Sequence, residues 1–160
     1  MTHRTLIALL TATVLLSAPI AHACARTSDA QALEAETIRL VNVVRRDKGL
    51  APVRAAAGLE RSAQGHACDI AARQTTSHVS ANGGTLKTRL NRSGYRPRVA
   101  SENTGRGFTS PAQAVHWWMT SPPHRANILM ASVREIGVGL AVSEAPDTRL
   151  HWVVNFGVSR

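Results

Sequence analysis

Hydrophobic residues recur at helical spacing through the first part of the chain, beginning with one apolar stripe near its start. Ser28 and Gln31 have the spacing of a capping box. Gly49 followed by Pro52 is typical of a helix end. The positions between these signals that fall on one helical face are Leu33, Thr37, Leu40, Val41 and Val44. We therefore predict a first helix between Ser28 and Gly49.

Further helices are predicted from periodicity and from proline and glycine punctuation. One runs from about Gly58 to Thr75, with an inner face of Leu59, Ala63, Ala67, Ile70 and Ala71. A short helix covers residues 85–93 and ends at Gly94, and another begins at Pro111. The stretch SPPHRANIL (121–129) allows a helix to start at Pro123, with His124 in its first turn.

The pattern changes to strict alternation near the end of the chain, which predicts an antiparallel hairpin. Its bulky positions are Ile136, Val138, Leu140 and Val142, then Leu150, Trp152, Val154 and Phe156. Gly137, Gly139 and Ala141 leave the other face of the first strand nearly bare, so a helix can pack closely there. Residues 99–105 add another strand. Helices followed by a hairpin give an α+β class, with helices covering a small sheet.

The first 23 residues have the features of a secretory signal peptide. An apolar run over residues 6–16 follows a single arginine and precedes Ala21 and Ala23 in an A-x-A arrangement. Cleavage after Ala23 leaves Cys24 first, and cleavage after Ala25 is a rival; lipoprotein anchoring at Cys24 is a less favoured alternative. We predict a secreted or periplasmic protein with one domain over residues 24–160, in which no segment is apolar enough to cross a membrane.

The composition shows two further features, a net positive charge and a pair of cysteines. The chain has 19 Lys and Arg against 10 Asp and Glu, a formal charge of +9. This favours anionic partners such as lipid head groups or cell-envelope polymers, although a solvated basic surface is the simpler explanation. Nucleic acid is disfavoured because no basic run is interleaved with aromatics. Export predicts a Cys24–Cys68 disulfide; the alternative is a free thiol at Cys68 with Cys24 lost or modified.

Three residues are candidates for chemistry: His78, Glu102 and His124. Both histidines lie in loops or at a helix start among turn-forming residues, where sites concentrate. Glu102 lies among small polar residues in SENTG (101–105). A carboxylate between two imidazoles could orient them or join them around a divalent cation. The long, irregular spacing does not by itself establish a metal site. His66, within the second helix, is assigned a structural role.

Several ordered motifs resemble the CAP superfamily of cysteine-rich secretory, antigen 5 and pathogenesis-related proteins. They are TSHVSANGG, ASENTGRGF, AVHWWMTSPPHRANIL, REIGVGLAV and HWVVNFG, and the resemblance to the compact bacterial secreted branch runs from about Ala32 to Gly157. It implies a three-layer α-β-α sandwich with a central antiparallel sheet. It also implies a surface cleft lined by His78, His124 and Glu102 that holds Zn²⁺ or another divalent cation in some members. Ser121 stands where many eukaryotic members have a second glutamate, which weakens a cation site.

The resemblance leaves the activity open between several classes. We favour an exported binding module whose His/Glu cleft takes a divalent cation or a lipid-like ligand. The alternative is a secreted hydrolase acting on peptide, lipid or cell-wall substrates, with His78 or His124 as general base and Glu102 as its orienter. Its nucleophile would be a metal-bound water or a nearby hydroxyl from Ser77, Ser80, Ser101 or Ser121. A metal-dependent nuclease is the least supported reading.

Overall fold

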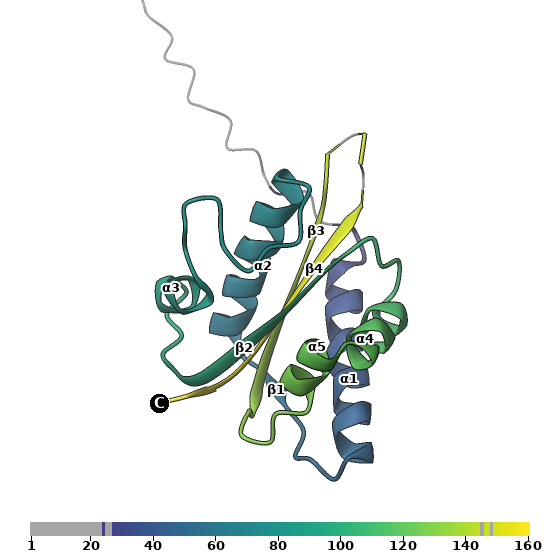
Figure 1. Cartoon of the computed structure of the whole chain (residues 1–160), viewed down its shortest axis with the longest axis vertical. Coiled ribbons are helices and arrows are strands. Elements are labelled where there is room, and N and C mark those ends of the chain that lie inside the picture. Colours follow the sequence, from purple (N-terminus) through teal and green to yellow (C-terminus); the bar gives the residue numbers. More distant parts are fainter. Residues whose placement is uncertain (1–23, 25–26, 145, 148) are drawn as a thin grey trace, which may run out of the picture.

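The chain forms a four-stranded sheet with helices on both faces (Figure 1). The computed structural model describes Cys24 and residues 27–144, 146–147 and 149–160, so the predicted signal peptide lies outside the described residues. The strands are β1 (Arg54–Ala55), β2 (Pro97–Arg106), β3 (Glu135–Val142) and β4 (Leu150–Ser159). The helices are α1 (Ala30–Asp47), α2 (Ala57–Ala72), α3 (Leu86–Arg92), α4 (Pro111–Thr120) and α5 (Pro122–Ile128).

The hairpin forms as the alternation predicts, and the separate strand predicted over residues 99–105 lies within β2. Strands β3 and β4 form the antiparallel hairpin, and β2 runs antiparallel along the other side of β4. The sheet order is β1-β3-β4-β2, so β2 is an edge strand. The two-residue β1 pairs parallel with β3 and makes the sheet mixed rather than wholly antiparallel. Two residues are too few to show an alternating pattern, which explains why β1 was not predicted.

One face of the sheet is covered by α2 and α3, and α2 packs directly on the glycines of β3. A Cβ atom at Gly137 would lie 2.2 Å from the backbone nitrogen of Glu60, and one at Gly139 would lie 2.3 Å from that of Gln64. The prediction that the bare face of this strand accepts a close helix is therefore confirmed. The predicted inner residues of α2 are all buried.

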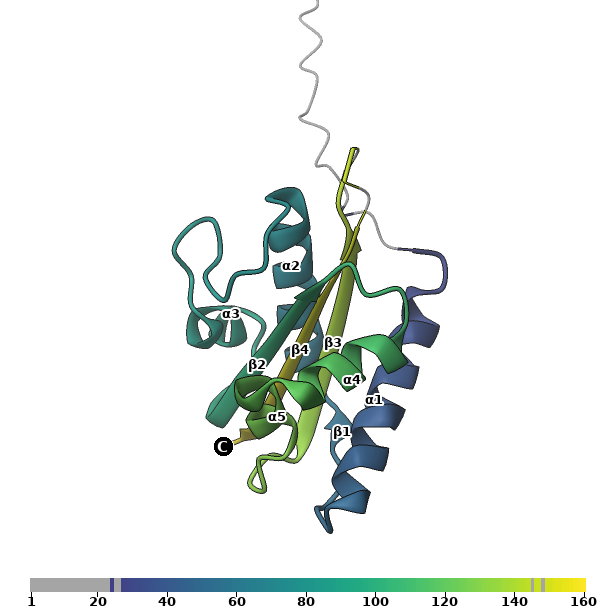
Figure 2. The same cartoon turned by 45° about the vertical axis from the view of Figure 1, so that its right-hand side comes forward.

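Helices α1, α4 and α5 cover the opposite face, so the molecule has three layers (Figure 2). The core between them and the sheet includes Trp118 from α4 and Trp152 from β4, both fully buried. Helix α1 begins one residue later than the capping box requires. Its N-cap is Asp29, which makes no side-chain capping bond, and the predicted pairing of Ser28 with Gln31 is wrong because Ser28 precedes the cap.

A buried arginine fixes α5 relative to α1. Arg45 of α1 is fully buried, and its guanidinium donates to the carbonyl oxygens of Ile128 at 2.7 Å and Met130 at 3.0 Å. It also donates to the carbonyl oxygens of Ala51 and Val133. Because these carbonyls belong to the end of α5 and the loops beside it, one side chain holds the helix that carries His124.

A disulfide joins Cys24 to Cys68 of α2, 44 residues apart in the chain. This confirms the predicted pairing and not the free-thiol alternative. It anchors the start of the domain to the helix that packs on the bare face of β3. Among the described residues, no helix has the length and apolar character needed to span a membrane.

Candidate functional site

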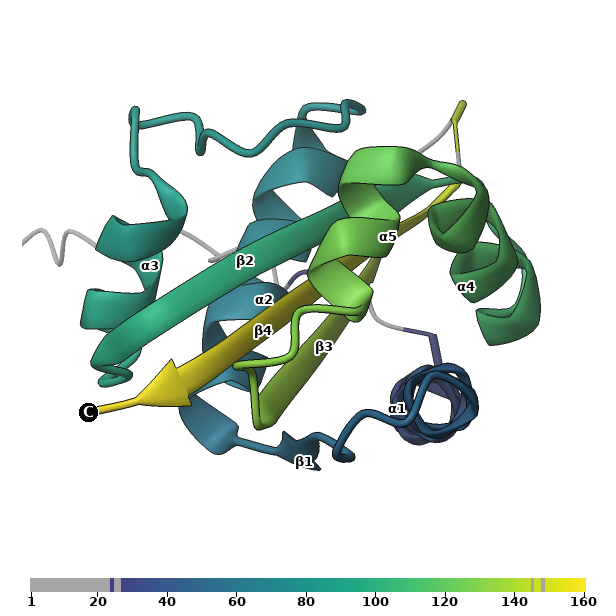
Figure 3. The same ribbon diagram turned by 60° about the horizontal axis from the view of Figure 1, so that its bottom comes forward.

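The candidate site forms around the edge strand β2, where both helical layers reach the sheet margin (Figure 3). Successive side chains of a strand point to opposite faces. Glu102 contacts His78 and Arg89, on the face covered by α2 and α3. Asn103 contacts His124 and Asn127, which belong to α5 on the other face. Two adjacent residues of one strand therefore hold the two predicted histidine segments.

The carboxylate of Glu102 is the centre of the first half of this site. Its Oε1 accepts a hydrogen bond from Nδ1 of His78 at 2.9 Å, and its Oε2 accepts one from Arg89 at 2.6 Å. Asn155 lies opposite Glu102 in the β2–β4 register, and its amide nitrogen, in the orientation that satisfies both amide atoms, is 3.0 Å from Oε2. Glu102 is only 6% exposed. Both oxygens of the buried carboxyl group thus have hydrogen-bond partners.

Arg89 also builds the loop that carries His78. Its NH1 group donates to the carbonyl oxygens of His78 at 3.0 Å and Gly84 at 3.1 Å, and to Ser80 Oγ at 3.3 Å. A guanidinium offers five donors in a rigid fork, so a single arginine can satisfy a carboxylate and a loop together. The loop is consequently fixed to Glu102 through Arg89.

His78 is oriented by Glu102 and faces solvent with its other nitrogen. The hydrogen bond to Glu102, with the carboxylate charge, raises the pKa of His78 despite partial burial. Because a carboxylate only accepts, Nδ1 carries the hydrogen and neutral His78 presents Nε2 as a free lone pair. The side chain is 58% exposed, and Nε2 has no hydrogen-bond partner among the described residues.

A second imidazole, that of His66, contacts the loop that carries His78. His66 of α2 is fully buried, and its Nε2 donates to the carbonyl oxygen of Ser77 at 2.6 Å. Its Nδ1 is 3.4 Å from Ser80 Oγ. Burial, and secondarily the charge of Arg89, lower the pKa of His66, while Glu102 opposes the shift. The assigned structural role is consistent with these contacts, and the segment that His66 supports is the one bearing His78.

His124 occupies the first turn of α5, which Pro122 opens one residue earlier than predicted. Its carbonyl oxygen accepts from Asn103 Nδ2 at 3.1 Å, and its ring lies 5.2 Å from that of Trp117. Nδ1 is 2.8 Å from Ser121 Oγ. Burial, then the charge of His78, lower the pKa of His124. The two histidines therefore interact electrostatically, although they come from opposite layers.

Asn127 braces this arrangement. Its amide donates to the carbonyl oxygen of Glu102 at 3.1 Å and to Asn103 Oδ1 at 2.8 Å. In the part of the chain that the structure describes, no hydrogen bond joins the His124 ring to His78 or Glu102, and no three His, Cys, Asp or Glu side chains form a metal-binding cluster. The structure brings His78 and Glu102 into direct contact, and Asn103, the next residue of β2, hydrogen-bonds to the backbone of His124.

Sequence reasoning missed Arg89 as a partner of Glu102. A lone arginine in a short helix carries no local signal of burial, and its partner is 13 residues away on a strand. The burial of His66, by contrast, could have been predicted from the sequence. Its position falls between the inner residues Ala63, Ala67 and Ile70 of α2, so the helical period could have indicated that it is buried.

A mixed sheet sandwiched between two helical layers defines the class of this domain. Residues 38–156 match the cysteine-rich secretory protein (CAP) family. The chain belongs to this family.

Two proteins of Bacillus subtilis are similar to the chain. It is 31% identical to the uncharacterized protein YkwD over 116 residues, which are 72% of this chain and 45% of YkwD. It is 32% identical to the uncharacterized membrane protein YlbC over 107 residues, 67% of this chain and 31% of YlbC. The chain therefore spans less than half the length of these curated relatives.

Solved structures share the fold at lower identity. An extracellular SCP-domain protein from Bacillus anthracis has a TM-score of 0.73 and 24% identity, with coverage of 84% of this chain and 45% of that one. An outer surface protein of Borrelia burgdorferi has a TM-score of 0.76 and 18% identity, covering 86% of this chain and 100% of that one. NaASP2, crystallised with Zn²⁺, has a TM-score of 0.58 and 12% identity, covering 84% of each. These likenesses establish the fold.

Proposed function

We propose that the chain is an exported binding domain in which the Nε2 atoms of His78 and His124 hold one divalent cation. The observation that carries the proposal is the 2.9 Å hydrogen bond from His78 Nδ1 to Glu102. Metal-binding histidines commonly donate their other ring nitrogen to a carboxylate, which fixes the tautomer and increases ligand basicity. Glu102 would thus position His78 rather than bind the cation itself.

The contacts of Glu102 explain this division of roles. One oxygen accepts from His78 and the other from Arg89, so a cation bound at Glu102 would have to displace these partners and approach a guanidinium. His124 can supply the second ligand. When its Nδ1 carries the hydrogen, Ser121 Oγ accepts it at 2.8 Å and Nε2 keeps a lone pair. Solvent or the natural ligand would complete the coordination, which two imidazoles leave open.

Isothermal titration of the full chain with ZnCl₂ tests this function. Zinc is the first cation to try because the distant neighbour NaASP2 was crystallised with it. We expect one site per chain that is lost in His78→Ala and in His124→Ala. His116→Ala is the matched control, since His116 is exposed on α4. Equal heats for wild type and both site variants would end the cation proposal.

Glu102→Gln separates positioning from direct ligation. The amide keeps the size of the side chain but no longer raises the basicity of His78. If Glu102 acts only through His78, zinc affinity falls by about 10–100-fold with one site retained. Complete loss of zinc binding in a variant that remains folded would show that Glu102 is itself a ligand. The site would then have the three ligands that the sequence predicts, His78, His124 and Glu102.

A hydrolase is the second candidate, and it is favoured by one contact. Among the four serines considered near the site, only Ser121 hydrogen-bonds to one of the two site histidines in the described residues. A lowered His124 pKa leaves the ring neutral and able to act as a base near pH 7. In this reading the Ser121 hydroxyl donates to Nδ1, the reverse of the direction that cation binding requires.

Covalent labelling distinguishes the two candidates. A hydrolase that uses Ser121 as nucleophile predicts that a fluorophosphonate probe modifies Ser121, and that His124→Ala abolishes the labelling. Ser80→Ala serves as control because its hydroxyl contacts His66 and Arg89 instead. Absence of labelling in wild type would exclude this nucleophile.

A further inference from the structure

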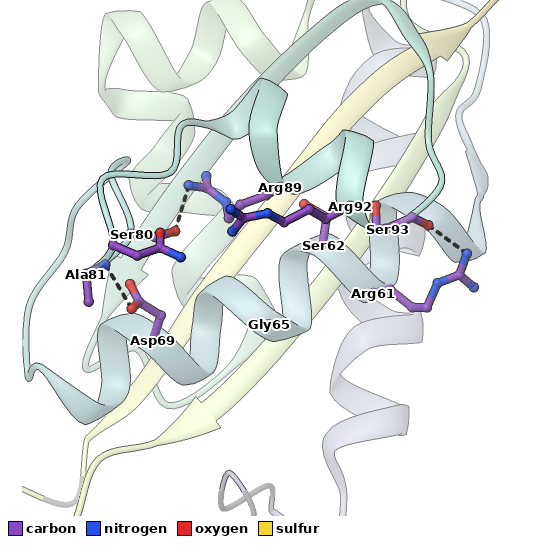
Figure 4. A pocket seen from close by; sticks show the side chains of 10 residues that line it. Arg61, Ser62, Gly65, Asp69, Ser80, Ala81, Arg89, Arg92 and Ser93 are labelled. Carbon is purple, nitrogen blue, oxygen red and sulfur yellow. Dashed lines mark hydrogen bonds between the residues drawn. The ribbon is translucent and has the colours of Figure 1, made fainter.

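The structure carries a second candidate site on either side of α3, whose lining does not include His78, Glu102 or His124. A groove of about 550 Å³ lies between α2 and α3 and the loop that follows α2 (Figure 4). A second groove of about 480 Å³ lies on the other side of α3, between that helix and the start of β2. We call them the α2–α3 groove and the α3–β2 groove.

Two arginines in the α2–α3 groove have no carboxylate partner among the described residues. Arg61 is exposed, and its guanidinium donates to the carbonyl oxygen of Ser93 at 2.9 Å. Arg92 is exposed, has no ion pair within the described part of the chain, and in the close view extends from α3 along the groove toward the Ser80 side. The third arginine, Arg89, is already neutralised by Glu102. Two guanidinium charges are therefore available to a ligand.

Asp69 is the single acidic residue that lines this groove among the described side chains, and it does not neutralise the charges of Arg61 and Arg92. Asp69 accepts from the backbone nitrogen of Ala81 at 3.0 Å and from Arg73 at 2.6 Å. Burial tends to raise the pKa of Asp69, but these hydrogen bonds outweigh it and hold the pKa low. Its charge is consequently balanced by Arg73 and not by Arg61 or Arg92.

All charged residues that line the α3–β2 groove are basic. It contains Lys87, Arg96, Arg98 and Arg160, all exposed, and no acidic residue lines it among the described side chains. Arg96 donates to Asn91 at 3.0 Å, a neutral partner. Because α3 has only seven residues, the two grooves are separated by one short helix.

We propose that the two grooves form one binding surface for a linear polyanion that carries phosphate groups. Guanidinium groups bind phosphate through two parallel hydrogen bonds, and arginines free of carboxylates on both sides of α3 match a ligand with repeated charges. The recessed shape favours a chain that lies in the grooves over a flat membrane. The exposed large hydrophobic residues of the described chain, Val79 and Trp117, line neither groove, so this surface offers no large apolar side chain to a bilayer.

Anisotropy of fluorescently labelled linear polyphosphate with the full chain tests the surface. Arg61→Ala/Arg92→Ala and Arg96→Ala/Arg98→Ala should each weaken binding by about tenfold and make its salt dependence shallower. The control is Arg46→Ala/Lys48→Ala, which removes the same charge from exposed positions at the end of α1 and should leave the affinity within about twofold. Equal losses in all three variants would overturn the proposal, because net charge alone would explain binding.

A variant without any charge change makes the test independent of electrostatics. Gly65 lines the α2–α3 groove, and a Cβ atom there would meet nothing within 4 Å. Gly65→Leu should therefore fill the groove, weaken polyphosphate binding by about tenfold and leave the folded structure intact. Unchanged binding in this variant would contradict occupation of the groove.

Two further probes separate the sources of phosphate. Pyrophosphate should bind much more weakly than the polymer, because it is too short to engage both sides of α3; equal affinity would overturn the two-groove surface. Vesicles of phosphatidylglycerol and phosphatidylcholine should bind no better to wild type than to Arg61→Ala/Arg92→Ala. Vesicle binding that depends on these arginines, with polyphosphate binding that does not, would replace the polymer by a membrane.

Discussion

Arg89 and Glu102 form an ion pair of 2.6 Å, and each residue is less than one-tenth exposed. The pair joins α3 to the edge strand β2, and the same guanidinium holds the loop that carries His78. A buried charge is tolerated when it is paired and hydrogen-bonded, and here both terminal nitrogens of Arg89 have acceptors, whereas its buried Nε has none among the described residues. This pair is the structural basis for the orientation of His78.

Removing Arg89 should therefore strongly destabilise the domain. In Arg89→Met the buried carboxylate of Glu102 loses its cation, and we expect the free energy of unfolding in urea to fall by about 3–5 kcal/mol. Arg92→Met is the control, because Arg92 is exposed on the same helix and should change stability by less than about 0.5 kcal/mol. A similar small effect for both variants would contradict the role of the pair.

The Glu102→Gln variant should reveal the interaction between Glu102 and His78 through the pH dependence of its stability. The pKa of His78 is raised in the folded chain, so its contribution to stability is fully present below the unfolded pKa of about 6.5 and is lost as pH rises through the folded pKa. The variant should thus lose more stability at low than at high pH. NMR titration should show a lower His78 pKa in the variant. Identical stability differences at both ends of the range would refute this linkage.

The glycines of β3 give a sharp test of the close contact with α2. Gly137→Ala places a methyl group against the α2 backbone at Glu60, so we expect a loss of about 3 kcal/mol in urea unfolding. Gly65→Ala is the matched control within α2. Its methyl group meets open space, and it should be neutral or stabilise by up to about 1 kcal/mol. Equal tolerance of the two substitutions would show that α2 is not held so closely.

The Cys24–Cys68 disulfide leads to two predictions. One concerns the stability lost when the disulfide is removed, and the other concerns the chemical state of Cys24. Closing a loop of 44 residues restricts the unfolded chain, so Cys68→Ser should lower the free energy of unfolding by about 4 kcal/mol. If the signal peptide is cleaved after Ala23 as predicted, the protein should retain Cys24, oxidised in the disulfide and carrying no other modification. Intact mass spectrometry checks this directly. Loss of Cys24, or a lipid on its sulfur, would restore the alternatives of cleavage after Ala25 or lipoprotein anchoring.

The fold was largely predictable because its elements carry strong local signals. The alternation that places Val138 and Trp152 in the core, and the glycines between the bulky residues of β3, predicted both the hairpin and the helix packed on it. The first-helix cap was wrong by one residue, since Asp29 and not Ser28 precedes α1. The short strand β1 was missed because its pairing depends on β3, far along the chain.

The site was predictable only in part. His78, Glu102 and His124 came from motifs, and the structure shows a direct contact between the first two. The role of Glu102 could not be read from the sequence, because it depends on which groups occupy its two oxygens. Arg89 and the facing Asn155 reach it through tertiary contacts that no local pattern encodes.

The central claim is that His78 and His124 share one cation through Nε2 while Glu102 keeps its hydrogen bond to His78. NMR of the imidazole ¹⁵N resonances during a zinc titration measures this most directly. The account predicts that Nε2 of both histidines shifts with the same one-to-one saturation, that His78 Nδ1 keeps its hydrogen, and that His116 does not respond. Saturation at different zinc concentrations, or shifts at only one of the two rings, would contradict it.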